Sequence, residues 1–112
     1  MVEHLQLTRT DGLPVCRARV ATSFGSRFRG LMGAAELPPG EGLLLPGTSS
    51  VHTHFMRFPI DVVFLDTERR IVSVVPALRP WRFAAAQGSD SVLELAAGEC
   101  ERLGLAEGDV LR

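Results

Sequence analysis

The chain has 112 residues, of which 46% are hydrophobic and 22% charged, and its formal net charge at pH 7 is -1. This length fits one compact domain, and the composition is that of an ordinary folded, soluble domain and not of a disordered chain. The 12 basic and 13 acidic residues are scattered, so no basic stripe is present to neutralise a phosphate backbone. We therefore predict a single domain over residues 1–112 and exclude nucleic acid as a partner.

Missing residue types remove several chemistries. The chain contains no lysine and no asparagine, which excludes Schiff-base chemistry, a P-loop and a Cys-His-Asn protease. It has no apolar run of 18 residues and no visible signal peptide, so we predict no membrane partner and a cytoplasmic location. Cys16 and Cys100 form no C-x-x-C pair; in a reducing cytoplasm they would be small buried apolar side chains, and in an exported protein they could form a disulfide.

The N-terminal part predicts a hairpin and a helix. Residues His4–Thr10 and Val15–Val20 alternate polar and apolar side chains, and the Asp11-Gly12 pair between them is a strong hairpin signal. A short helix is expected over Phe24–Arg29, because Thr22 and Ser23 are good N-cap residues and glycines follow.

The middle of the chain predicts strands. Gly42–Leu45 is a brief apolar run. Val51–Met56 and Ile60–Leu65 are expected to be the two central strands of the sheet, and Arg70–Val75 completes a meander with them. Ile60–Leu65 is apolar on both faces apart from Asp61, which is typical of a strand covered on both sides.

The C-terminal part predicts a loop, two strands and a second helix. Residues Pro76–Gly88 contain two prolines and favour an ordered loop. Ser91–Leu95 is expected to be a strand, Ala96–Leu103 a short helix, and Val110–Arg112 a last strand. The whole pattern predicts an α+β domain dominated by antiparallel β-sheet, curled or barrel-like, with two short helices.

The histidines of Val51–Met56 suggest a metal site as one alternative. In an extended strand His52, His54 and Met56 would share one face, and imidazole with thioether suits zinc or copper. The other interpretation is that His52 satisfies backbone groups and Met56 fills the core. We favour the second, because no cysteine or carboxylate neighbours this strand in the sequence.

Asp61 requires a partner, since it interrupts an apolar strand. The candidates are Arg57, Arg29 and His52. A carboxylate–arginine pair would be a structural clasp, whereas a carboxylate–histidine pair could act as a general base. We favour the clasp.

Trp81 lies between Arg79 and Arg82 on a segment stiffened by proline. This group could hold an anion or a planar ligand. Alternatively, Trp81 could fill the end of a barrel while the arginines extend outward, and we favour this second interpretation.

Several motifs together resemble the domain of unknown function 192 family of small bacterial and archaeal proteins, over nearly the whole chain. They are Arg29-Gly30-Leu31-Met32, Gly40-Glu41-Gly42-Leu43-Leu44, the run from Phe55 to Asp66, Val92-Leu93-Glu94-Leu95, Gly98, Gly104-Leu105 and Gly108-Asp109. The resemblance implies a small β-rich domain without an established activity, in which Arg29, Met56, Asp61 and Asp66 are characteristic positions. The family pattern commonly has an aromatic residue or glycine where this chain has His54, and some relatives look exported.

The sequence hypothesis is a non-enzymatic ligand-binding or accessory domain for an unknown small molecule or protein, with no cofactor assigned. Its pocket is expected near the central hairpin, and the candidate residues are Arg29, His52, His54, Met56, Arg57, Asp61 and Trp81. The alternatives are a hydrolase or isomerase using His52 and Asp61, a zinc or copper protein, and an interaction module with an apolar patch near Phe24 and Phe28.

Overall fold

The structure, a computed structural model, describes residues 3–21 and 36–112. The described part contains eight strands and one short helix, α2 (Glu99–Leu103). The strands are β1 (Glu3–Thr8), β2 (Pro14–Val20), β3 (Glu41–Pro46), β4 (Ser50–His52), β5 (Ile60–Leu65), β6 (Ile71–Leu78), β7 (Phe83–Ala85) and β8 (Ser91–Ala96).

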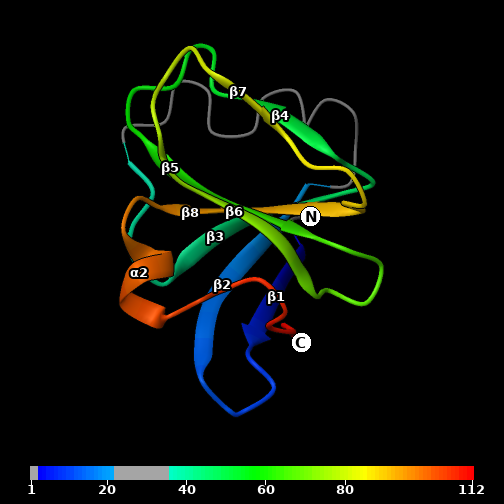
Figure 1. Cartoon of the computed structure of the whole chain (residues 1–112). Coiled ribbons are helices and arrows are strands. Elements are labelled where there is room, and N and C mark those ends of the chain that lie inside the picture. Colours follow the sequence, from blue (N-terminus) through cyan, green and yellow to red (C-terminus); the bar gives the residue numbers. More distant parts are fainter. Residues whose placement is uncertain (1–2, 22–35) are drawn as a thin grey trace.

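Six of these strands form one mixed sheet in the order β1-β2-β3-β8-β5-β6. The β2–β3 pair is parallel and the other neighbours are antiparallel. Strands β4 and β7 form a separate antiparallel pair, which lies over one face of the sheet in Figure 1. The middle of the sheet is therefore β8 between β3 and β5, with β4 outside it.

Each face of the sheet carries its own apolar core. On β5, Ile60, Val62 and Phe64 pack with Val51 and Met56 beneath the β4–β7 pair. The alternate side chains Val63 and Leu65 pack on the other face with Cys100 and Leu103 of α2. Every residue of β5 is buried, which confirms the prediction of a strand covered on both sides.

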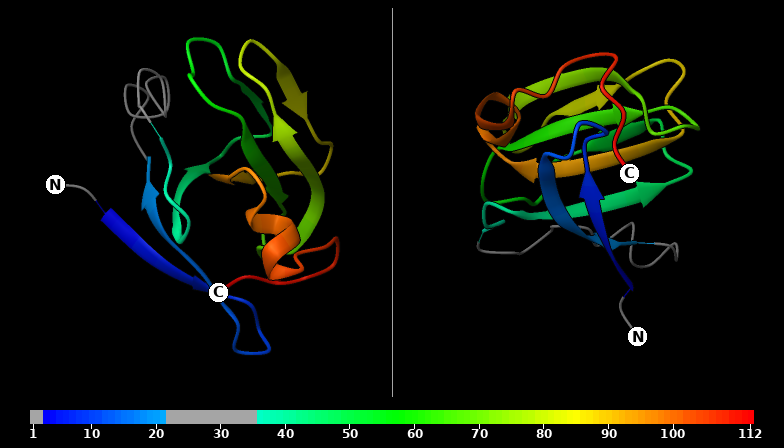
Figure 2. Two further views of the ribbon diagram at one scale, coloured as in Figure 1. Left: turned by 90° about the vertical axis from the view of Figure 1, so that its left-hand side faces the viewer. Right: turned by 90° about the horizontal axis from the view of Figure 1, so that it is seen from below.

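The sheet is curved but not closed. Figure 2 shows its strands following a curve in the left-hand view. Single bridges join Arg9 to Leu111 and Arg70 to Val110, and backbone hydrogen bonds join the C-terminal residues to Thr8 of β1 and Ile71 of β6. The predicted last strand Val110–Arg112 is therefore wrong, because these residues form isolated bridges to the two edges of the sheet. The prediction of a predominantly β domain is confirmed, whereas the α+β description with two short helices is not. The barrel-like form is not confirmed either, because the sheet of the described residues is mixed and not closed. The predicted helix Phe24–Arg29 lies outside the described residues.

The predicted strand Val51–Met56 is wrong beyond His52. Strand β4 ends there and pairs with β7, so β5 has β6 and β8 as its neighbours instead. The physical reason is the backbone of Phe55, whose φ of 66° is left-handed and cannot continue an extended strand. Strand β7 and the end of β6 likewise occupy part of the segment 76–88 that was predicted as a loop.

Other local predictions hold with smaller changes. Asp11-Gly12 turns the β1–β2 hairpin, with Gly12 at a φ of 98°. The second helix is shorter than predicted, and Gly104 ends it in the left-handed region. Cys16 and Cys100 are both free and buried, and burial raises the pKa of each thiol to about 12, so neither is an activated nucleophile.

Candidate functional site

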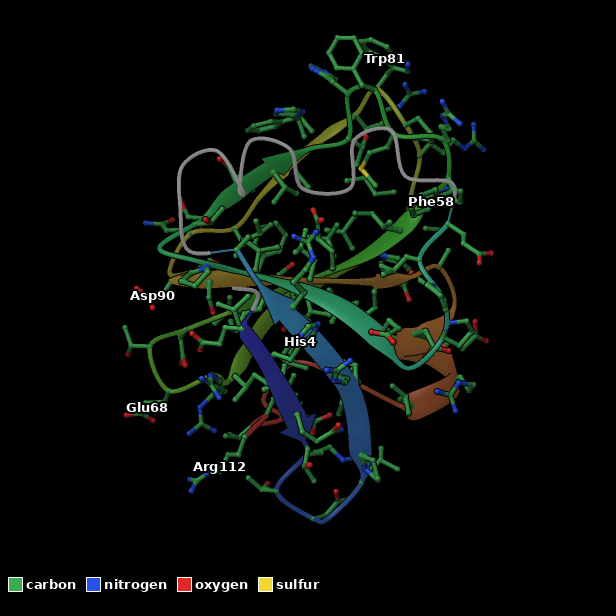
Figure 3. The ribbon with its side chains drawn as sticks, turned by 180° about the vertical axis from the view of Figure 1, so that it is seen from behind. His4, Phe58, Glu68, Trp81, Asp90 and Arg112 are labelled. Atoms are coloured by element: carbon green, nitrogen blue, oxygen red, sulfur yellow. The ribbon has the colours of Figure 1, made fainter. Side chains whose placement is uncertain are left out.

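The most unusual surface of the described chain lies on the β4–β7 pair and its flanking loops, residues 50–59 and 79–85, here called the aromatic arm. Phe55, Trp81 and Phe83 are 60%, 56% and 67% exposed and are the large apolar side chains exposed in the described part of the chain. Figure 3 places Trp81 at the extreme end of the molecule, remote from Arg112. Three exposed rings gathered on one structural element indicate a surface available for binding.

The aromatic side chains of the arm contact one another in series. The ring centroids of His52 and His54 are 4.7 Å apart, and His54 stacks on Trp81 at 5.2 Å. Phe55 meets Trp81 edge to face at 4.7 Å, and Phe83 lies directly opposite His52 in the β4–β7 register. The rings of His52, His54, Trp81 and Phe55 therefore form one connected series, and Phe83 lies across the strand pair from its His52 end.

Thr53 is the buried residue that joins the two loops of the arm. Its side chain is fully buried, and its Oγ1 donates to the Arg79 carbonyl and accepts from the Arg82 amide at 2.9 Å. Its backbone amide donates to the Arg82 carbonyl, and its carbonyl accepts from the Trp81 amide. One threonine therefore fixes both loops that carry exposed rings.

Two of the exposed rings stand on strained backbone. Phe55 and Trp81 have φ values of 66° and 64°, a region in which residues other than glycine are uncommon. Such a conformation costs on the order of 1–3 kcal/mol and persists only where the surroundings enforce it. Thr53 supplies that enforcement, because its carbonyl also accepts from the amide of Met56, directly after Phe55.

Replacing Thr53 with valine tests this arrangement. Valine keeps the shape but leaves the Arg79 carbonyl and the Arg82 amide without their Oγ1 partner, which we expect to cost about 2 kcal/mol of the free energy of unfolding. Trp81 is the only tryptophan of the chain, so we expect its fluorescence to become more sensitive to acrylamide quenching. Thr67→Val, at an exposed turn position, is the control; equal quenching in both variants would contradict the role given to Thr53.

The charge of the arm has one sign. Arg57, Arg79 and Arg82 are exposed, and residues 42–60 and 70–89 contain no aspartate or glutamate. The two chain segments that form the arm therefore contribute no carboxylate to it. The surface offers flat rings and guanidinium groups, which together suit a ligand that carries negative charge.

Asp61 does not belong to this surface. It is 1% exposed, and its Oδ1 accepts from the Ala77 amide at 2.9 Å. Its Oδ2 accepts from the amides of Gly98 and Cys100 at 3.1 and 2.9 Å. These contacts give Asp61 a structural role, but not through the favoured carboxylate–arginine clasp: in the described ranges it accepts from backbone amides, with no bond to Arg57 or His52, and Arg29, the other candidate, lies outside those ranges.

The two candidates for an acid–base pair, His52 and Asp61, lie on different sides of the sheet. Asp61 alternates with the side chains packed beneath the arm, so it faces α2, whose amide it binds. His52 is exposed on β4, where its Nδ1 accepts from the His54 amide at 3.3 Å. The structure does not bring the proposed base and its carboxylate together.

The shared face predicted for His52, His54 and Met56 is also wrong. Met56 is 7% exposed and packs in the core beneath the arm, whereas both histidines are exposed. The left-handed turn at Phe55 separates the methionine from the histidines. Within residues 3–21 and 36–112, no group of three or more His, Cys, Asp or Glu side chains could hold a metal ion.

The other candidate residues from the sequence lie in different parts of the chain. Arg29 and the predicted patch at Phe24 and Phe28 lie outside the described residues. Arg57 is on the arm, and Trp81 is more than half exposed, so its predicted role as the filling of a barrel end is wrong. Asp66, a characteristic position of the resemblance, accepts from the amides of Glu68 and Arg70, which lowers the pKa of its carboxyl.

Sequence reasoning missed three contributors to the arm, namely Thr53, Phe55 and Phe83. No local signal distinguishes a fully buried threonine from an exposed one. The two phenylalanines were assigned to an extended strand and a loop, in which their side chains could not be placed relative to Trp81.

Comparison with known proteins identifies the family. The family model DUF192, described as "Uncharacterized ACR", matches residues 6–112. A "UPF0127 protein" of Thermococcus sibiricus is 36% identical over 98 residues, which are 83% of this chain and 63% of that protein. Another UPF0127 protein, from Pyrococcus furiosus, is 34% identical over 100 residues, and the match covers 83% of each of the two chains. The chain belongs to the DUF192 family of uncharacterised function, and it spans about 63% of the length of the Thermococcus relative.

Two solved structures have the same fold. A crystal structure of a protein of unknown function from Novosphingobium aromaticivorans has a TM-score of 0.85 and 25% identity, covering 99% of this chain and 84% of that one. A protein from Sinorhizobium meliloti has a TM-score of 0.87 and 24% identity, covering 100% and 93%. No helix in the described ranges is long and apolar enough to span a membrane.

Proposed function

We propose that this chain is a non-enzymatic binding domain and that the aromatic arm is its binding surface. The observation that carries the proposal is the connected series of exposed rings from His52 to Trp81. A contiguous group of exposed apolar rings is unfavourable in water, and on a folded protein such a group marks an interaction site. The sheet and its two cores act as the support.

The fixed geometry of the arm favours binding over catalysis. Its loops are held by Thr53 in a strained backbone conformation, so the rings are positioned before a ligand arrives, which reduces the entropy lost on binding. The candidate polar residues of the arm are His52, His54 and Arg57. They recognise charge and shape. The Nδ1 of His52 accepts from the His54 amide, whereas in a His-Asp pair this nitrogen donates to the orienting carboxylate.

A ligand screen tests the proposal. The chain is titrated with metal ions, nucleotides, sugars and organic acids, and the melting temperature and Trp81 fluorescence are recorded, since a ligand of the folded state raises the melting temperature. We expect at least one anionic compound to raise it, and the effect to be lost in the double variant Phe55→Ala/Phe83→Ala. Arg17→Ala, an exposed residue of β2, is the control. A ligand that acts equally on the double variant would rule out the arm as its site.

The proposal keeps the cytoplasm as the location of the domain. The free, buried state of Cys16 and Cys100 supports this location, because disulfides are rare in reducing compartments.

A further inference from the structure

The charge distribution of the chain limits what the arm could bind. The arm contributes three arginines and no acidic residue, so the rest of the chain has nine basic and 13 acidic residues, a balance of -4. The arm therefore has a net positive charge, and within residues 3–21 and 36–112 it also carries the exposed large aromatic side chains Phe55, Trp81 and Phe83. Complementary charge is how such surfaces select their partners, and the partner should be acidic.

The size of the surface limits the partner further. An aromatic side chain offers about 150–250 Å², so the exposed fractions of 60%, 56% and 67% at Phe55, Trp81 and Phe83 correspond to roughly 400 Å² of ring surface. A standard protein interface takes about 800 Å² from each partner. The rings of the arm therefore suit a short segment better than a folded domain.

The residue types indicate a polypeptide. Interface cores are enriched in aromatic residues and arginine and depleted in lysine and acidic residues, and tryptophan and arginine are the residues that most often dominate binding energy. Each guanidinium group can bind a carboxylate through two parallel hydrogen bonds. On this basis, and resting on the function proposed above, we propose that the aromatic arm binds a short acidic peptide segment whose carboxylates alternate with apolar side chains.

In the proposed complex the apolar side chains of the segment lie against the rings of Phe55, Trp81 and Phe83. The carboxylates of the segment pair with the exposed arginines of the arm, Arg57, Arg79 and Arg82. Because these arginines are exposed, their attraction is screened by salt, and binding should weaken as ionic strength rises. The rings should supply most of the binding that persists at high salt.

The test uses a short synthetic peptide in which Glu and Asp alternate with Phe and Leu, and a second peptide with Lys in place of each acid. We expect the acidic peptide to change Trp81 fluorescence in a saturable manner and the lysine peptide to leave it unchanged. Arg82→Glu and Phe83→Ala should each weaken binding about tenfold or more. Arg17→Glu, the same charge reversal at an exposed position of β2, should leave it unchanged. Melting curves establish that each variant is folded.

Anionic vesicles of phosphatidylserine and phosphatidylcholine and a single-stranded thymidine oligonucleotide are titrated in parallel. If either binds through the arm while the acidic peptide does not, the peptide proposal is overturned and the arm remains a binding surface. The same holds if a compound of the ligand screen acts through the arm and the peptide is inert. If no probe acts through the arm, the proposed function fails as well.

Discussion

Replacing Asp61 with alanine is expected to destabilise the chain by about 4 kcal/mol, near the upper end for single substitutions. The Asp61 carboxylate accepts hydrogen bonds from the amides of Ala77, Gly98 and Cys100. Removing it leaves the buried amide of Cys100 and the partly buried amides of Ala77 and Gly98 without this acceptor, and losses of this kind cost about 1–3 kcal/mol each. The substitution therefore acts on β5, the end of β6 and the start of α2 together.

Asp61 also replaces the usual N-terminal cap of α2. Gly98 is at the N-cap position and has no side chain that could bind the first amides of the helix. The carboxylate of Asp61 on β5 takes this role, because it accepts a hydrogen bond from the amide of Cys100. In Asp61→Asn one of the two carboxylate oxygens is replaced by an NH2 group. This group is a donor and would face a backbone amide, which is also a donor. We expect Asp61→Asn to cost about 2–3 kcal/mol, less than alanine.

The measurement is the free energy of unfolding from urea titration, followed by far-ultraviolet circular dichroism. Asp90→Asn, the same chemical change at an exposed position, is the control and should stay within about 0.5 kcal/mol of the parent chain. If Asp61→Asn were equally neutral, Asp61 would not have the structural role given to it here.

The predictions from sequence succeeded where one local pattern dominates. Asp11-Gly12 predicts a hairpin because only a few residue pairs adopt its backbone conformation. The run Ile60–Leu65 predicts a strand covered on both sides because both of its faces are apolar. Asp61 was identified as a residue in need of partners from the cost of burying an isolated charge.

The failures arose where distant contacts override a local pattern. Val51–Met56 reads as a strand, yet hydrogen bonds from Thr53 to residues 79–82 hold the chain in a turn at Phe55. The described chain gives Asp61 backbone amides as donors, which every residue except proline possesses, so no sequence pattern could name them. The order β3-β8-β5 also depends on pairings between segments far apart in the chain, whereas local patterns predict a meander of sequence neighbours.

Glu94 gives the second large effect, as a dependence of stability on pH. It lies in the middle of β8, between Leu43 of β3 and Val62 of β5, and is 4% exposed. Burial raises the pKa of its carboxyl from an ordinary value of 4.5 to about 7. The folded state therefore holds a proton that the unfolded state releases near pH 4.5. Relative to the ionised form, the protonated Glu94 side chain contributes about 3 kcal/mol to the free energy of unfolding. This stabilisation is fully present below pH 4.5, decreases as the pH rises, and is lost above pH 7.

We expect the free energy of unfolding to fall between pH 5 and pH 8 in the parent chain and to change much less in Glu94→Gln, since glutamine keeps the shape of protonated glutamate but does not titrate. Urea titrations at both pH values measure the difference. Glu107→Gln, at an exposed position, should retain the parent's pH dependence.

Other titrating groups act outside this pH range. The carboxylates with lowered pKa values change stability only at more acidic pH, and the buried thiols only at more alkaline pH; these carboxylates are Asp11, Asp66 and Glu99. A parent chain equally stable at pH 5 and pH 8 would mean that Glu94 is already ionised in the folded protein at the lower pH.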